Sequence, residues 1–120
     1  MKNALIITIL AILLPSASAL GAHVHKEKEY QAAWCARVDG VTEYRLEDGA
    51  RVDCLTDTHA IEFDFAPKWA ESIGQSLYYA RMTGKQPGVV LIMENEGDGR
   101  YLDRLNAVAE KYSIKVWTIR

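Results

Sequence analysis

The sequence predicts an α/β domain in which a small mixed sheet is flanked by helices, with its elements in the order αβββαβαβ. Three observations predict this class. Short segments with alternating apolar and polar residues follow one another closely at 42–46, 51–55 and 60–65, as in an antiparallel meander. Two longer segments, 67–82 and 100–112, repeat their apolar residues at helical spacing. Each of these is followed by a short apolar segment, at 89–93 and 114–119.

The individual elements follow from local signals. A first helix is expected over 27–38, because Tyr30, Ala33, Trp34 and Arg37 are spaced to form one face before a Gly ends the pattern. An Asp-Gly pair within 47–50 predicts the hairpin turn of the meander. The run 89–93 is wholly apolar, as in a strand that is buried on both faces. The helix between this strand and the last one predicts a right-handed parallel crossover.

The N-terminal segment 1–19 has the pattern of a secretory signal peptide. Lys2 precedes an apolar run, and Ala17-Ser18-Ala19 places small residues where a signal peptidase cleaves. We therefore expect a periplasmic or secreted protein, with no membrane attachment after cleavage. An uncleaved N-terminal anchor is the alternative interpretation.

Residues 20–120 then constitute a single domain of ordinary size. The net charge of −2 is not that of a protein that binds nucleic acid through an extended basic patch, although a local groove is compatible with it. An exported chain with two cysteines predicts a disulfide between Cys35 and Cys54.

Three acidic residues of the meander suggest a metal site. Glu62 and Asp64 alternate with apolar residues on the third strand, and Asp53 lies on the strand before it. If the two strands pair, these carboxylates gather on one side of the sheet. Clustered carboxylates repel one another, so a hard divalent cation is their usual partner. Ordinary solvated acids on the outer face of a sheet are the alternative.

The order of elements and the position of the acids resemble the PD-(D/E)xK nuclease superfamily, and most closely its RecB-type and Holliday-junction-resolvase-like branches. The matching text is Glu43, then Arg51-Val52-Asp53, then Ile61-Glu62-Phe63-Asp64, then Gly74-Gln75-Ser76-Leu77-Tyr78-Tyr79. The resemblance extends from about Glu27 to Ile119. It implies a restriction-endonuclease-like core and an exported enzyme that hydrolyses phosphodiester bonds of DNA or RNA with Mg²⁺ or Mn²⁺.

The resemblance also assigns roles. The expected catalytic residues are Asp53, Glu62, Lys68 and Gln75; the expected metal ligands are Asp53, Glu62, Glu43 and Asp64; the expected substrate contacts are Tyr79 and His59. Lys68, Gln75 and Tyr79 share one polar stripe of the helix over 67–82, which favours a common site.

One departure from the family pattern matters for activity. Asp64 stands where the family has the lysine of Glu-x-Lys, and Lys68, at the start of the next helix, is the candidate substitute. That lysine would hold or deprotonate the attacking water and stabilise charge on the phosphate. If Lys68 does not replace it, the chain is a catalytically inactive nuclease-fold domain that binds nucleic acid or a protein partner. A structural periplasmic protein with a similar topology is a third interpretation.

Several of these residues keep a second interpretation. Glu43 either serves the metal site or forms a surface ion pair with Arg45 or Arg51. Asp64 is either a third ligand or a strand-edge charge, and Lys68 is either catalytic or a surface residue. His59 lies in the turn before the third strand, where a solvated histidine is the ordinary outcome.

Overall fold

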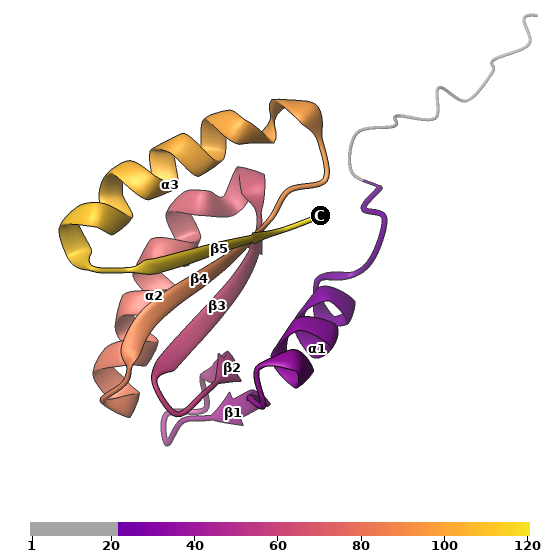
Figure 1. Ribbon diagram of the computed structural model, residues 1–120. Coiled ribbons are helices and arrows are strands. Elements are labelled where there is room, and N and C mark those ends of the chain that lie inside the picture. The colour runs from indigo at the N-terminus through magenta and orange to yellow at the C-terminus, as the bar shows by residue number, and fades with distance from the viewer. Residues whose placement is uncertain (1–21) are drawn as a thin grey trace, which may run out of the picture.

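The computed structural model describes residues 22–120, where the chain forms a mixed five-stranded sheet and three α-helices (Figure 1). The elements are α1 (Glu27–Arg37), β1 (Val41–Arg45), β2 (Arg51–Leu55), β3 (His59–Phe65), η1 (Ala66–Lys68), α2 (Trp69–Thr83), β4 (Gln86–Ile92), η2 (Glu96–Asp98), α3 (Gly99–Tyr112) and β5 (Lys115–Ile119). The α/β class and the order of the elements agree with the prediction. The predicted signal peptide, 1–19, lies outside the described residues.

The sheet has the strand order β1-β2-β3-β4-β5. The first three strands are antiparallel, which is the predicted meander, whereas β3–β4 and β4–β5 are parallel pairs. Strand β4 begins earlier than the apolar run indicates, because Gln86 and Pro87 also pair with β3. Because these two side chains are not part of an apolar run, hydropathy does not predict that the strand begins here.

Helices cover both faces of the sheet. On one face, α2 and α3 pack against Val89 and Leu91 of β4, and Leu105 and Ala109 of α3 complete that core. On the other face, Trp34 of α1 packs with residues of β3, β4 and β5. Figure 1 shows α1 beside the meander and α3 beside β5, at the other edge of the sheet. Strand β3 of the meander therefore contacts both α1 and α2.

Helix α2 contacts the sheet partly through small polar residues. Ser72 and Ser76 are fully buried, and each hydroxyl donates a hydrogen bond within the helix, to Trp69 O at 2.6 Å and to Ile73 O at 3.0 Å. These bonds satisfy the hydroxyls without solvent. The predicted apolar stripe, with Trp69 and Ile73, packs against the α3 side of the core. The buried face of α2 is therefore wider than its apolar pattern indicates.

The predicted disulfide between Cys35 and Cys54 is present, with a Cα–Cα distance of 5.8 Å. Both cysteines are fully buried, and a Cβ atom on Gly40 would lie 2.5 and 2.6 Å from their sulfurs, so only glycine fits there. A buried disulfide is compatible with an oxidising, extracytoplasmic location. Between residues 22 and 120 no helix combines the length and the apolar character needed to cross a bilayer.

Candidate metal centre

Three carboxylates from three elements converge beside the meander. One oxygen atom each of Glu27, Asp53 and Glu62 lies within 4.8 Å of the other two. Glu27 begins α1, Asp53 is in the middle of β2, and Glu62 is in the middle of β3. We call these three residues the carboxylate cluster. The sheet alone accounts for two of its members, and the third is delivered by a helix.

The backbone geometry of the meander explains the position of Asp53. Strands β2 and β3 pair at Cys54–Ile61 and Leu55–Ala60. At Asp53, the residue before Cys54, a side chain replaces the backbone as the partner of β3. Asp53 Oδ2 accepts a hydrogen bond from Phe63 N at 2.8 Å. The carboxylate is thereby held against β3, directly beside Glu62.

Three sets of contacts hold helix α1 in position. The disulfide joins Cys35 to the residue that follows Asp53. Gln31, one turn earlier, is buried, and its Nε2 donates to Asp53 O at 2.8 Å. Near the start of the helix, the hydroxyl of Tyr30 and the backbone N–H of Val24 each donate to Glu94 at 2.8 Å. Glu27 therefore reaches the cluster from a rigidly held helix.

Burial, and after it the negative charge of the neighbouring carboxylates, raises the pKa of all three cluster residues. Burial, followed by the charge of Asp53, raises the pKa of Glu62 to about 11. Burial is also the main cause that raises the pKa of Asp53 and of Glu27. A protonated Glu62 can share its proton with Asp53, which further raises the pKa of Glu62 and opposes the rise for Asp53. At neutral pH, the metal-free cluster keeps at least one proton.

Asp64 extends the negative region along β3. Its side chain is on the same face of the strand as that of Glu62, two residues away, and both residues are about 95% buried, with exposures of 5% and 4%. Burial, followed by the charge of Glu27, raises the pKa of Asp64 to about 7. The sequence interpretation of Asp64 as a strand-edge charge does not fit this environment, because edge residues are exposed to water.

Two buried oxygen atoms in this region have no hydrogen-bond partner, namely Glu62 Oε2 and Asp64 Oδ2. A buried polar atom without a partner is costly, so natural proteins rarely leave one unsatisfied. Carboxylate oxygens are also the donor atoms that Mg²⁺ and Mn²⁺ favour. The donor set, its proximity and its two unsatisfied oxygens therefore fit a hard divalent cation.

Lys68 lies close enough to influence the cluster. It ends η1 and precedes α2, and its positive charge lowers the pKa of both Glu27 and Asp64, against the larger effect of burial. Its ammonium forms no ion pair within 4.0 Å among the described residues. Lys68 thus lies within electrostatic range of these carboxylates, and none of them forms an ion pair with it.

Tyr79 and Gln75 of α2 form a polar pair next to the cluster. The Tyr79 hydroxyl donates to Gln75 Oε1 at 3.4 Å. Burial, followed by the negative charges of Glu62 and Asp53, raises the pKa of Tyr79. Of the predicted stripe, Tyr79 is therefore buried near the carboxylates, whereas Lys68 and Gln75 are exposed. Tyr78 points elsewhere, and its hydroxyl donates to Asp48 at the hairpin turn.

Glu43 lies outside the carboxylate cluster and is surrounded by nitrogen donors. Its carboxylate is 3.9 Å from Lys28 Nζ, 3.9 Å from Arg51 Nε and 3.5 Å from Gln31 Nε2. Of the two arginines that the sequence offers as its partner, the structure selects Arg51. Glu43 also has a positive φ of 53°, a conformation that costs energy for a residue other than glycine.

His59 is not part of this site. The alternation along β3 places it on the face of Ile61 and Phe63, opposite to Glu62. Its ring packs edge-on against Trp117, with centroids 5.4 Å apart, and its Nδ1 is 2.8 Å from Thr58 Oγ1. The structure therefore separates His59 from the other predicted site residues.

Sequence reasoning overlooked two residues of the site, Glu27 and Gln31. A signal for both was present, because they lie two turns and one turn before Cys35 on the same face of the helix. The disulfide attaches Cys35 next to Asp53, so the same helical face must continue along the acidic strand.

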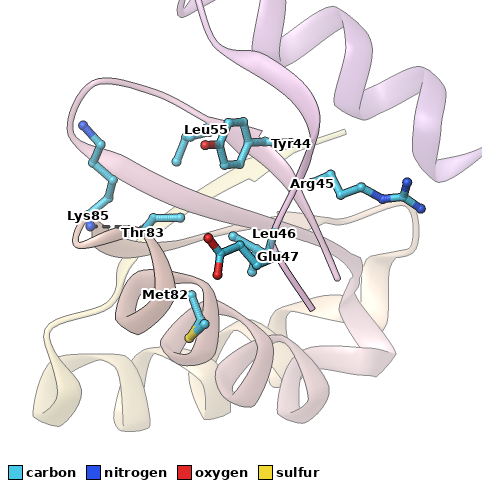
Figure 2. A pocket seen from close by; sticks show the side chains of 8 residues that line it. All are labelled: Tyr44, Arg45, Leu46, Glu47, Leu55, Met82, Thr83 and Lys85. Atoms are coloured by element: carbon cyan, nitrogen blue, oxygen red, sulfur yellow. Dashed lines mark hydrogen bonds between the residues drawn. The ribbon is translucent and has the colours of Figure 1, made fainter. Parts of the chain in front are cut away.

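A separate cavity of about 430 Å³ lies between the β1–β2 hairpin and the C-terminal end of α2. Figure 2 shows the side chains that line it: Tyr44, Arg45, Leu46, Glu47, Leu55, Met82, Thr83 and Lys85. The side chains of Arg45 and Lys85 point to opposite sides of it, so they do not form one cationic site. None of the three cluster carboxylates lines the cavity.

Comparisons with protein-family models, with curated proteins and with solved structures gave no match to this chain.

Proposed function

We propose that the protein is an exported, divalent-metal-dependent nuclease that hydrolyses phosphodiester bonds of nucleic acid. The observation that carries the proposal is the convergence of Glu27, Asp53 and Glu62, together with the unsatisfied buried oxygen of Glu62. The order of the elements supports it further, since it resembles the restriction-endonuclease-like core of the PD-(D/E)xK nucleases. In that arrangement Glu27 takes the place of the early acid that the sequence assigned to Glu43.

The proposal assigns each residue a task. Glu27, Asp53 and Glu62 hold Mg²⁺ or Mn²⁺, and Asp64 adds a fourth carboxylate nearby. The bound ion would lower the pKa of a coordinated water and neutralise charge on the phosphate. The Lys68 ammonium stabilises the charge that develops on the phosphate and donates a hydrogen bond that holds the attacking water. Gln75 and Tyr79 orient that water or a phosphate oxygen.

The reaction adds one water across a phosphodiester. The water oxygen forms a bond to phosphorus, the bond from phosphorus to one ester oxygen breaks, and the products are a phosphate monoester and an alcohol. Within residues 22–120 the ammonium of Lys68 has no carboxylate partner, which supports its task, because a lysine already neutralised by a carboxylate would be less available to a phosphate.

The test is a cleavage assay with plasmid and labelled oligonucleotides, with Mg²⁺, Mn²⁺ or EDTA present. We expect cleavage that requires the metal and is lost in Asp53→Asn/Glu62→Gln. Asp103→Asn, an exposed change of the same kind on α3, is the control and should cleave normally. Metal-independent cleavage, or full activity of the double variant, would contradict the proposal.

One observation favours a second candidate, a nuclease-fold domain that binds metal and nucleic acid or a protein partner without cleavage. Asp64 occupies the place of the family's lysine and is buried, so Lys68 must act from a neighbouring element. Titration with Mn²⁺ in a calorimeter separates the two candidates. Metal binding that depends on Asp53 and Glu62, with no cleavage of any substrate, would identify the binding domain.

A further inference from the structure

Two basic side chains from different elements meet at Glu43, beside the carboxylate cluster. Lys28 comes from α1, one residue after Glu27, and Arg51 comes from β2, two residues before Asp53. Each lies 3.9 Å from one of the two carboxylate oxygens of Glu43. The two cations thus lie on either side of one acid. Each is one or two residues away in sequence from a proposed metal ligand.

These contacts are long and exposed. The side chains of Lys28 and Arg51 are 79% and 57% exposed, and that of Glu43 is 33% exposed. Exposed ion pairs of this kind contribute little to stability, because water screens them and ordering two long side chains costs entropy. The pairs therefore do not explain why two cations are gathered here, or why Glu43 adopts a strained backbone conformation to meet them.

This group lies directly beside the cluster. The pairing of β1 with β2 places Glu43 opposite Asp53. Gln31 Nε2, which donates to Asp53 O at 2.8 Å, is also 3.5 Å from Glu43 Oε1. A phosphate next to the one bound at the metal would thus meet Lys28 and Arg51. Arg51 can bind phosphate through two parallel hydrogen bonds, and Lys28 as a compact charge.

The geometry points to a second phosphate site, formed by Lys28 and Arg51, that binds the backbone of a polynucleotide next to the scissile bond and is occupied by the Glu43 carboxylate until substrate displaces it. This inference rests on the proposed nuclease function and narrows its substrate to a chain of phosphodiesters. Glu43 is then a positioning residue that keeps the two cations together, and it is not a metal ligand.

Binding should be measured by fluorescence anisotropy with a fluorescein-labelled oligonucleotide, single-stranded and as a duplex, in Ca²⁺ and at several salt concentrations. We expect Lys28→Ala/Arg51→Ala to weaken binding by roughly tenfold at low salt and to reduce the salt slope by about 1 to 2. Lys111→Ala, an exposed lysine on α3, should leave both quantities unchanged.

For Glu43→Gln, the direction of the change in oligonucleotide affinity tests the inference. Because the substitution removes the competing carboxylate, it should strengthen oligonucleotide binding severalfold, and it should lower Mn²⁺ affinity far less than Asp53→Asn does. A loss of Mn²⁺ affinity as large as that of Asp53→Asn would mean that Glu43 is a metal ligand, and would overturn the inference. Equal oligonucleotide affinity and salt slope in Lys28→Ala/Arg51→Ala and in the unmodified protein would overturn it as well.

A small substrate separates this inference from the nuclease proposal. Bis-p-nitrophenyl phosphate has no second phosphate, so its hydrolysis with Mn²⁺ should be equally fast in Lys28→Ala/Arg51→Ala and in the unmodified protein. If the unmodified protein neither binds Mn²⁺ nor hydrolyses any substrate, the nuclease proposal itself is rejected. Slower hydrolysis of this compound in Lys28→Ala/Arg51→Ala would instead place the two cations at the scissile phosphate and overturn the second site.

Discussion

Gln31 of α1 donates a hydrogen bond from Nε2 to the backbone carbonyl of Asp53, at 2.8 Å, and is itself buried. The bond attaches the helix that delivers Glu27 to the strand that delivers Asp53. One amide therefore connects the helix and the strand that carry two carboxylates of the cluster. The structure of the site depends on this contact and on the disulfide next to it, and both can be tested.

Gln31→Leu should destabilise the protein and weaken its metal site. The substitution keeps the volume of the side chain but leaves the Asp53 carbonyl without its buried partner, which costs about 1–3 kcal/mol of unfolding free energy. Mn²⁺ affinity should fall together with stability, because Asp53 and Glu27 lose their common anchor. Urea denaturation and calorimetric Mn²⁺ titration measure the two effects, with the exposed Gln86→Leu as control. Unchanged Mn²⁺ affinity would show that the amide has no part in ordering the ligands.

Removal of the disulfide should reduce metal affinity as well as stability. Cys35→Ser/Cys54→Ser releases a cross-link between residues 19 apart in sequence, which typically costs about 2–5 kcal/mol in a small exported domain. Because Cys54 adjoins Asp53 and Cys35 shares a helix with Glu27, the ligands should also lose their relative positions. Mn²⁺ affinity should be compared at a temperature where circular dichroism shows that the variant is folded. A folded variant with normal affinity would mean that the rest of α1 suffices to place Glu27.

The metal-free protein should lose stability as the pH rises from about 4 to about 7. Folding raises the pKa of Asp64 from 3.8 to about 7, and raises that of Glu62 further. The folded state therefore binds more protons than the unfolded state in this window, so the free energy of unfolding falls with increasing pH, by an amount on the order of a few kcal/mol. Melting temperatures in EDTA across this range measure it. The variant Asp64→Asn should show a smaller slope, and a melting temperature that rises with pH in EDTA would contradict the charge assignment.

Added Mn²⁺ should reverse this trend. The cation binds deprotonated carboxylates, so its stabilising effect should be small near pH 5 and large near pH 8. The difference between melting temperatures with Mn²⁺ and with EDTA is the quantity to follow. In Asp53→Asn/Glu62→Gln this difference should vanish at every pH. An equal stabilisation by Mn²⁺ in that variant would place the ion elsewhere.

Lys68→Ala should slow cleavage strongly and leave metal binding intact. The lysine lies within electrostatic range of the carboxylates but forms no ion pair with them, so its loss removes a charge-stabilising donor without removing a ligand. We expect cleavage to slow by about 10²–10³-fold, the range for loss of one such donor. Cleavage rates and Mn²⁺ affinities should be measured on the same preparations, with Lys111→Ala as control. Normal cleavage by Lys68→Ala would assign the lysine's task to another residue.

Local hydropathy patterns predicted most of the helices and strands. The alternation in the meander, the two amphipathic helices and the apolar run of β4 each have a period that reflects one type of element. The patterns were less informative where burial is achieved by other means. The early residues of β4 are Gln and Pro, and the contact face of α2 includes Ser72 and Ser76, whose hydroxyls are satisfied within the helix. Hydropathy detects neither.

For the candidate site, the sequence by itself determined the acids of the meander, the cysteine pair and the polar stripe of α2, because strand and helix periods assign side chains to faces. Only the tertiary structure decided which of these faces meet. In the structure, Glu27 and Gln31 lie next to Asp53. His59 lies on the opposite face of the sheet, against Trp117. Glu43 lies between Lys28 and Arg51. The physical reason is that periodicity acts within one element, whereas ligand convergence depends on how a disulfide and a few buried hydrogen bonds fix separate elements against one another.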